Sequence, residues 1–196
     1  MYCCPLPALP RSGSMSNPTA DPRAGGRPLR QVVFDEATIA QRVRALGKEI
    51  TEAYPDGDLL LIGLLKGSFV FLADLVRAVE RPLQVDFLIA SSYGAGTRST
   101  GEVRLLYEPA SALADRHILL VEDIIDSGRT LASLMDRLRS RGPRSLAICA
   151  LLDKRIAPPL PEVRFTGFVA PPAFLVGYGL DHAEEFRHLP YIADLG

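Results

Sequence analysis

Three carboxylates stand within five positions of one another in the stretch VEDIIDSGRTL, residues 121–131: Glu122, Asp123 and Asp126. They follow an apolar run, HILLV (117–121), and they precede a Ser-Gly pair. Acidic side chains that lie this close together repel one another unless water, a metal ion or a cationic partner compensates their charge. The stretch therefore indicates a polar binding site at the end of a buried strand.

A phosphate group is the ligand that the following residues favour. Asp126, Ser127, Gly128, Arg129 and Thr130 lead from the apolar run into a helical pattern. The start of a helix binds phosphate through its free N–H groups and the positive end of its dipole. Glycine lets the backbone approach the ligand, and the serine and threonine add hydroxyl donors. Neither a GxxxxGK[ST] loop nor a GxGxxG loop occurs in the chain, so this is a different class of phosphate site.

The acidic pair beside such a site needs its own explanation. Two carboxylates repel an anionic ligand unless a divalent cation or hydroxyl donors lie between them. Magnesium bridges carboxylates to substrate phosphates, and ribose hydroxyls can donate to carboxylates directly. A sugar phosphate satisfies both needs. The alternative for the DSGxT segment alone is an ordinary helix N-cap at Asp126 or Ser127 beside exposed acids; the complete pattern favours the phosphate site.

VEDIIDSGRTL resembles the phosphoribosyl pyrophosphate signature of the type I phosphoribosyltransferases. Residues 30 to 194 are similar to the bacterial hypoxanthine phosphoribosyltransferases within that family. The resemblance implies purine salvage: transfer of a phosphoribosyl group to N9 of hypoxanthine or guanine, with release of pyrophosphate and with Mg²⁺ as cofactor. Glu122 and Asp123 then hold the ribose hydroxyls, directly or through magnesium, and Asp126 is the candidate general acid/base at purine N7. Residues 126–130 bind phosphate.

Two further segments match parts of that family which handle pyrophosphate. GLLKGSFVF (63–71) resembles the pyrophosphate loop, which implies that Lys66, Gly67 and Arg187 bind pyrophosphate and that the peptide bond between Lys66 and Gly67 is cis. By itself, a Lys-Gly pair after a strand is a plain turn.

SSYG (91–94) resembles the flexible lid, in which Ser92 and Tyr93 close over the pyrophosphate side and exclude water. Without the resemblance, residues 91–104 indicate a polar loop or loose hairpin.

The purine pocket is expected near the C-terminus. Lys154 follows a predicted strand, and in the family the matching lysine donates to the 6-oxo group of the base. A cationic donor disfavours adenine, which carries an amino group there. Within FLVGYGLD (174–181), Phe174 is expected to stack on the purine, Leu175 to offer backbone groups, and Asp181 to approach a second magnesium through water. Outside this context, a lone lysine is usually solvated and a phenylalanine usually packs in a core.

The alternation of helix and strand patterns predicts an α/β fold with a mainly parallel central sheet flanked by helices and a small C-terminal hood region. Apolar residues at helical spacing predict three helices: one from Asp35 with Ile39, Val43, Leu46 and Ile50 inward; one with Phe69, Leu72, Val76 and Val79 inward; and one from Thr130 to Arg141 with Leu131, Leu134 and Leu138 inward. Strands are predicted at 59–65, 83–90, 117–121, 145–152, 163–169 and 174–178.

The chain is predicted to hold one domain, residues 29–196, with the hood mainly at 154–196. Residues 1–28 are rich in Pro, Gly, Ser and Asn and are predicted to be disordered. Met15 is a plausible second start, which makes residues 1–14 a candidate start-site artefact. The three cysteines (Cys3, Cys4 and Cys149) have no metal-ligand spacing and are expected to be reduced thiols.

Charge and hydropathy exclude several classes of protein. The chain has 22 basic and 23 acidic residues, which argues against general nucleic-acid binding. No apolar run approaches the ~20 residues of a membrane span, and no signal peptide is recognisable, so the cytoplasm is expected.

The resemblance implies a homo-oligomer, a dimer or tetramer. A xanthine- or guanine-preferring relative, a non-catalytic regulator on the same fold and a synthase of the sugar diphosphate stay as alternatives; the last has no room for a second domain copy.

Overall fold

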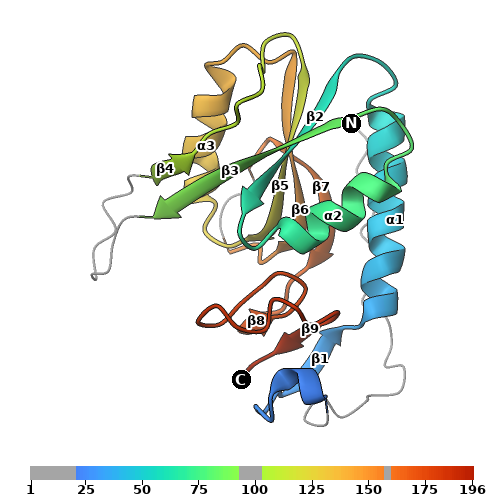
Figure 1. Cartoon of the computed structure of the whole chain (residues 1–196), viewed down its shortest axis with the longest axis vertical. Coiled ribbons are helices and arrows are strands. Elements are labelled where there is room, and N and C mark those ends of the chain that lie inside the picture. Colours follow the sequence, from blue (N-terminus) through green and yellow to red (C-terminus); the bar gives the residue numbers. More distant parts are fainter. Residues whose placement is uncertain (1–20, 93–102, 157–159) are drawn as a thin grey trace.

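A six-stranded sheet forms the centre of the computed structural model, which describes residues 21–92, 103–156 and 160–196 (Figure 1). The strand order is β4-β3-β2-β5-β6-β7, and every neighbouring pair is parallel except β3 and β4. This confirms the α/β class with a mainly parallel sheet. The strands are β2 (Leu59–Leu65), β3 (Gln84–Ser92), β4 (Val103–Tyr107), β5 (His117–Ile125), β6 (Ser145–Asp153) and β7 (Val163–Val169).

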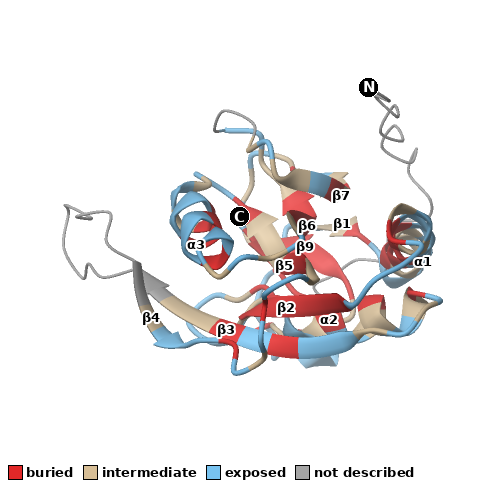
Figure 2. Ribbon diagram, turned by 90° about the horizontal axis from the view of Figure 1, so that it is seen from above, coloured by how far each residue is buried: buried red, intermediate tan, exposed pale blue. Residues whose placement is uncertain are grey.

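The sheet is covered on both faces by three helices, α1 (Glu36–Ala53), α2 (Phe69–Ala78) and α3 (Arg129–Arg139). Strand β2 shows why its sequence is a continuous apolar run. Leu59 and Leu61 pack in the cluster that holds the inward faces of α1 and α2, whereas Leu60 and Ile62 pack in the cluster that holds α3. Successive side chains of a strand point to opposite faces, so both sets are buried, and Figure 2 shows β2 almost wholly in the buried class.

Helix α1 begins where the sequence predicts. All four predicted inward residues are buried, and Asp35 caps the helix, accepting a hydrogen bond from the backbone N–H of Thr38 at 2.7 Å. This bond satisfies one of the N–H groups that the first helical turn leaves free, and it lowers the pKa of the Asp35 carboxyl group below its usual value.

Replacement of Asp35 by alanine should therefore destabilise the protein by about 1 kcal/mol, the typical worth of an N-cap, and lower Tm by roughly 2–4 °C. Asp35→Ser, which keeps a capping oxygen, serves as the control; an equal loss in both variants would contradict the capping role. Because the folded-state pKa is depressed, the stabilisation is present above the unfolded-state pKa of the carboxyl and disappears as the pH falls through the folded-state value. Thermal unfolding at several pH values measures both effects.

Helix α2 buries most of the predicted face and two further residues. Leu72 and the C-capping residue Val79 are buried, and Val76 is partly buried against the same cluster, as predicted. Phe71 and Leu75 are also buried, whereas Phe69 is 45% exposed, contrary to the prediction. The sequence FVFLADLVRA is apolar at most positions, so its periodicity does not select a single face. Helix α3 agrees with its prediction: Leu131, Leu134 and Leu138 are buried, and Gly142, at φ 69°, follows its end.

A second, smaller sheet lies beyond the carboxyl ends of the central strands (Figure 1). It has the order β1-β9-β8, with β1 (Gln31–Phe34), β8 (Leu175–Val176) and β9 (Ile192–Asp194). The expected strand at 174–178 is thus reduced to two residues, and β1 and β9 were not predicted, since three- and four-residue strands show too little alternation. Because β1 pairs with β9, the N-terminal part of the chain completes the hood.

The predicted disorder of residues 1–28 is wrong for the part that the structure describes. Residues Pro22–Ala24 form a short 3₁₀-helix capped by Asp21, and Ala24 is buried in a cluster with Leu29 and Phe186. The composition here marks a turn rather than disorder. The other predictions for the tail, at Cys3, Cys4 and Met15, lie outside the described residues. Cys149 is a buried free thiol in β6, and no described helix is long and apolar enough to cross a membrane.

Candidate active site

Glu122 and Asp123 belong to strand β5 rather than to the segment after it. The sequence places the end of this strand at Val121, but β5 continues to Ile125, and Glu122 pairs with Ala150 of β6. Hydrogen bonding of the backbone to β6 extends the strand regardless of the acidic side chains. Both carboxylates nevertheless lie near the carboxyl end of the parallel sheet, where open α/β sheets bind their ligands.

The two carboxyl groups have unusual electrostatics. Burial, together with the neighbouring charge of Asp123, raises the pKa of Glu122 well above its usual value, and burial also raises the pKa of Asp123. The Glu122 Oε2 atom is buried and has no hydrogen-bond partner among the described residues. A buried carboxylate oxygen without a partner costs free energy, and a cation or a ligand hydroxyl would supply what it lacks. The pair therefore fits magnesium or a ribose.

The third predicted metal-binding residue is placed elsewhere. Asp181, in the hood, forms a salt bridge with Arg187 Nη2 at 2.8 Å and accepts a hydrogen bond from the backbone N–H of Glu184 at 2.9 Å. Within the described part of the chain, no three His, Cys, Asp or Glu side chains form a metal cluster. Asp181 is therefore not grouped with Glu122 and Asp123, and its approach to a second magnesium stays a prediction.

The loop after β2 contacts the acidic pair. A Cβ atom on Gly67 would lie 2.5 Å from Asp123 Cγ and nearer still to its Oδ2, so only glycine fits there. The chain then turns into α2, where the buried Ser68 hydroxyl donates to the Leu64 carbonyl oxygen at 2.7 Å. The cis peptide bond lies between Leu65 and Lys66, one residue earlier than predicted. Neither this bond nor the predicted bond between Lys66 and Gly67 precedes a proline, so the residue types alone could not show which peptide bond is cis.

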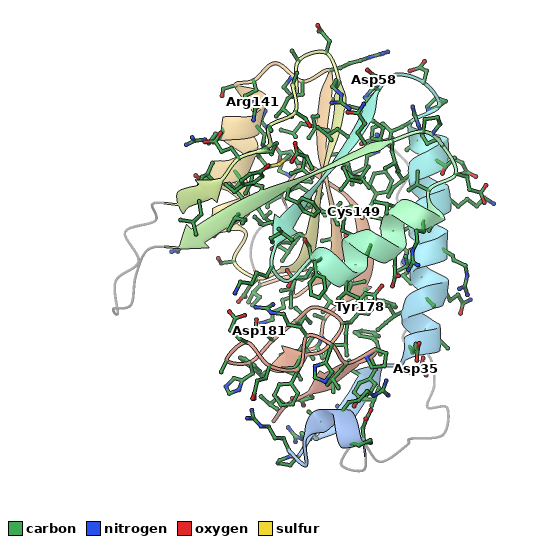
Figure 3. All side chains as sticks on the ribbon, viewed as in Figure 1. Asp35, Asp58, Arg141, Cys149, Tyr178 and Asp181 are labelled. Atoms are coloured by element: carbon green, nitrogen blue, oxygen red, sulfur yellow. The ribbon has the colours of Figure 1, made fainter. Side chains whose placement is uncertain are left out.

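The hood packs against this loop. A Cβ on Gly179 would overlap the Gly67 carbonyl oxygen, and Gly179 accepts from Arg187 Nη1 at 2.8 Å. The neighbouring residue Tyr178 joins the hood to helix α2, because its hydroxyl donates a hydrogen bond to Asp74 Oδ2 at 2.6 Å. Figure 3 shows Tyr178 and Asp181 in the hood segment below the strand ends. The predicted pyrophosphate residues Lys66, Gly67 and Arg187 are thus brought together.

Lys154 and Asp126 also come together, across the ends of β6 and β5. The Lys154 Nζ lies 3.7 Å from Asp126 Oδ2, and the Lys154 backbone N–H donates to the Ile125 carbonyl at 3.0 Å. Helix α3 begins at Arg129 after Gly128, whose φ is 69°, and no side chain in the described part of the chain caps it. The ordinary N-cap expected as the alternative at Asp126 or Ser127 is therefore absent, and the first-turn N–H groups lack a side-chain acceptor.

An exposed aromatic ring marks the hood side of the site. Phe174 is 50% exposed, and its ring centroid is 5.5 Å from that of His182, edge to face. Leu175 lies in β8, an edge strand of the small sheet. Sequence reasoning assigned no role in this region to His182, Tyr178, Asp74 and Glu184. The Tyr178–Asp74 and Lys66–Glu184 contacts join residues 104 and 118 positions apart, which local patterns do not reveal.

The predicted lid falls only partly within the described residues. Ser92 is the last residue of β3, and its backbone pairs with Val103 of β4 in an antiparallel ladder. The loop or loose hairpin expected over 91–104 lies mostly outside the described residues and stays a prediction. Tyr93 lies outside the described residues, so its part in the lid stays a prediction.

Comparison with known proteins adds independent findings. The sequence profile of the phosphoribosyl transferase domain matches residues 32–182. The chain is 48% identical over 166 residues to the hypoxanthine phosphoribosyltransferase of Salmonella typhimurium, covering 83% of this chain and 93% of that one. It is 44% identical over 172 residues to the hypoxanthine-guanine phosphoribosyltransferase of Dictyostelium discoideum, covering 85% and 95%. A crystal structure of a Staphylococcus aureus hypoxanthine phosphoribosyltransferase superposes with a TM-score of 0.82 at 39% identity, covering 86% and 92%.

Proposed function

This chain belongs to the phosphoribosyltransferase family, and we propose that it transfers the 5-phosphoribosyl group of phosphoribosyl pyrophosphate to N9 of hypoxanthine or guanine, giving IMP or GMP and pyrophosphate. One observation carries the proposal: a carboxylate pair, a helix start without a side-chain cap and a lysine–aspartate pair converge at the carboxyl ends of β5 and β6. Each matches one part of the sugar donor or the base.

The sugar donor is held at the end of β5. The first turn of α3, with Ser127, Gly128 and Thr130 at its entrance, binds the 5-phosphate through backbone N–H groups and hydroxyls; Arg129 stands in the same turn. Glu122 and Asp123 accept hydrogen bonds from the ribose hydroxyls. Glu122 Oε2 has no hydrogen-bond partner among the described residues, and burial raises the pKa of both carboxyl groups. Both observations support this assignment, because the ribose hydroxyls would give these buried carboxylates further donors.

Magnesium is the proposed cofactor. When bound, it neutralises charge on the diphosphate leaving group. Glu122 and Asp123 would hold it together with the ribose, and Asp181 would approach a second ion through water. The departing pyrophosphate is a polyanion, and Lys66, the Gly67 backbone and Arg187 stabilise it by fixed charges and dipoles. Their mutual contacts in the structure support this grouping.

The base lies between Phe174 and the end of β6. Phe174 stacks on the purine, and Leu175 offers backbone groups to its edge. Lys154 donates to the 6-oxo group, which selects oxopurines over adenine. Asp126 exchanges a proton with purine N7 as general acid/base. The 3.7 Å separation of Lys154 Nζ and Asp126 Oδ2 supports this assignment, since O6 and N7 are neighbours on one edge of the purine.

A competition experiment tests the function. Hypoxanthine, guanine, xanthine and adenine are mixed in equal amounts with phosphoribosyl pyrophosphate, magnesium and the enzyme, and the nucleotides are separated by chromatography. IMP, GMP or both should form, AMP should be at least tenfold less abundant, and a chelator should stop the reaction. Predominant XMP would move the chain to the xanthine-preferring alternative, and AMP as the main product would contradict the role of Lys154.

The physical state of the enzyme follows from the same family likeness. We propose a homo-oligomer, a dimer or tetramer, in the cytoplasm, without nucleic-acid or membrane partners. The near balance of 22 basic and 23 acidic residues supports the proposal that the enzyme has no nucleic-acid partner. Light scattering coupled to size-exclusion chromatography measures the assembly directly, and a monomeric mass of 21.3 kDa would contradict it.

A further inference from the structure

Glu184 stands in a tight turn that holds its side chain in a defined place. His182 and Glu185 exchange backbone hydrogen bonds at 3.2 and 3.1 Å, and the two residues between them, Ala183 and Glu184, have φ values of 52° and 67°. Such turns favour Asn and Gly at their central positions, because other residues are strained there. A glutamate is unusual in that backbone conformation, so the contacts of its side chain are of interest as the reason for its presence.

The Glu184 carboxylate contacts both cations assigned to pyrophosphate. Its Oε2 lies 3.0 Å from Lys66 Nζ and 3.4 Å from Arg187 Nη2. These side chains come from opposite parts of the site: Lys66 belongs to the loop after β2, and Arg187 belongs to the hood. One carboxylate oxygen therefore joins the two cations, as a bridging oxygen of an anionic ligand would.

We propose that Glu184 is an internal counter-ion, which pairs with Lys66 and Arg187 in the ligand-free enzyme and competes with the diphosphate group for them. This inference rests on the proposed function, because it takes Lys66 and Arg187 as pyrophosphate-binding residues. The substrate's diphosphate displaces Glu184, and Glu184 returns to the cations as pyrophosphate leaves. The device weakens diphosphate binding and helps to release the product.

The exposure of the three side chains sets the expected size of the effect. Lys66 and Glu184 are 66% and 64% exposed, so solvent screens their ion pair, whereas Arg187 is only 18% exposed. Exposed pairs are weak and shift an equilibrium by less than about fivefold each. Two such pairs together should weaken diphosphate binding by about 3- to 10-fold. Arg187 keeps its 2.8 Å contact with Asp181 when Glu184 leaves, so the cation stays in place for the ligand.

The decisive variant is Glu184→Gln, which removes the charge and keeps the shape. Calorimetry should show pyrophosphate and phosphoribosyl pyrophosphate binding about 3- to 10-fold more tightly than to the wild type. The gain should persist for pyrophosphate without magnesium, because Glu184 acts on the protein's own cations. Glu185→Gln is the matched control: it makes the same change in net charge at the next residue, whose carboxylate pairs with Arg27 instead.

The outcomes separate this inference from the function on which it rests. Unchanged or weaker binding of pyrophosphate to Glu184→Gln, with normal wild-type binding, overturns the counter-ion role alone, as does an equal gain in Glu185→Gln. Failure of the wild type to bind either ligand overturns the function and the inference together. Should the glutamine variant not fold, Glu184→Ala gives the same test, since it also removes the carboxylate from Lys66 and Arg187 and should tighten binding. In a Lys66→Met background the gain from Glu184→Gln should shrink.

Discussion

Replacement of Asp126 by asparagine is expected to lower kcat by about 10²- to 10⁴-fold, the usual contribution of a general acid/base, while changing the Kd for phosphoribosyl pyrophosphate less than tenfold. Asparagine has nearly the same shape and still presents an oxygen to Lys154, whose Nζ lies 3.7 Å from the carboxylate in an ion pair. It cannot exchange a proton with purine N7. The loss should therefore fall on the chemical step rather than on binding of the sugar.

Single-turnover kinetics and calorimetry measure these two quantities separately. Asp136→Asn is a suitable control, because Asp136 lies on the exposed side of α3 and, among the residues that the structure describes, forms an ion pair with Arg139 alone. It changes the net charge equally without touching the site. If Asp126→Asn weakened sugar binding as much as it slowed turnover, Asp126 would be a binding residue, and the proton transfer would have to be assigned elsewhere.

Local sequence signals predict some elements of this fold closely. Strands β2 and β7 have the predicted bounds, and α1 buries all four predicted residues. In each case the side chains that fix the element's place in the core are near one another in the sequence. The DSGxT segment is predictable for the same reason, since a glycine, the flanking hydroxyls and the helix start are consecutive.

Other features depend on partners that sequence spacing does not reveal. β5 runs four residues beyond its apolar segment because its backbone pairs with β6. β1 pairs with β9 from the opposite end of the chain. The bond between Tyr178 and Asp74 spans 104 positions, and that between Glu184 and Lys66 spans 118. The family resemblance could assign Lys66 and Arg187 to pyrophosphate, but only the folded structure shows that both meet Glu184.

Replacement of Gly67 by alanine is expected to lower kcat/KM for phosphoribosyl pyrophosphate by at least 10²-fold, because the added Cβ would enter the space of the Asp123 carboxylate, 2.5 Å from its Cγ. Asp123 is held in place: its Oδ1 accepts from the Ile124 backbone N–H at 2.9 Å. It must rotate out of this position, or the loop must withdraw from the site. Misplacement of a positioning group by about 1 Å can cost this much in rate.

The same overlap should cost about 1–3 kcal/mol of stability, as overpacking usually does, so the loss of activity must be separated from partial unfolding. Gly142→Ala provides the control. Its Cβ would meet nothing within 4 Å, but its φ of 69° strains an alanine, so it should lower Tm while leaving kcat/KM unchanged. In Gly67→Ala combined with Asp123→Ala the overlap is gone, and Tm should recover while activity stays low. Full activity in Gly67→Ala would mean that the loop and Asp123 are not in contact during catalysis, and the shared site at the ends of β2 and β5 would have to be abandoned.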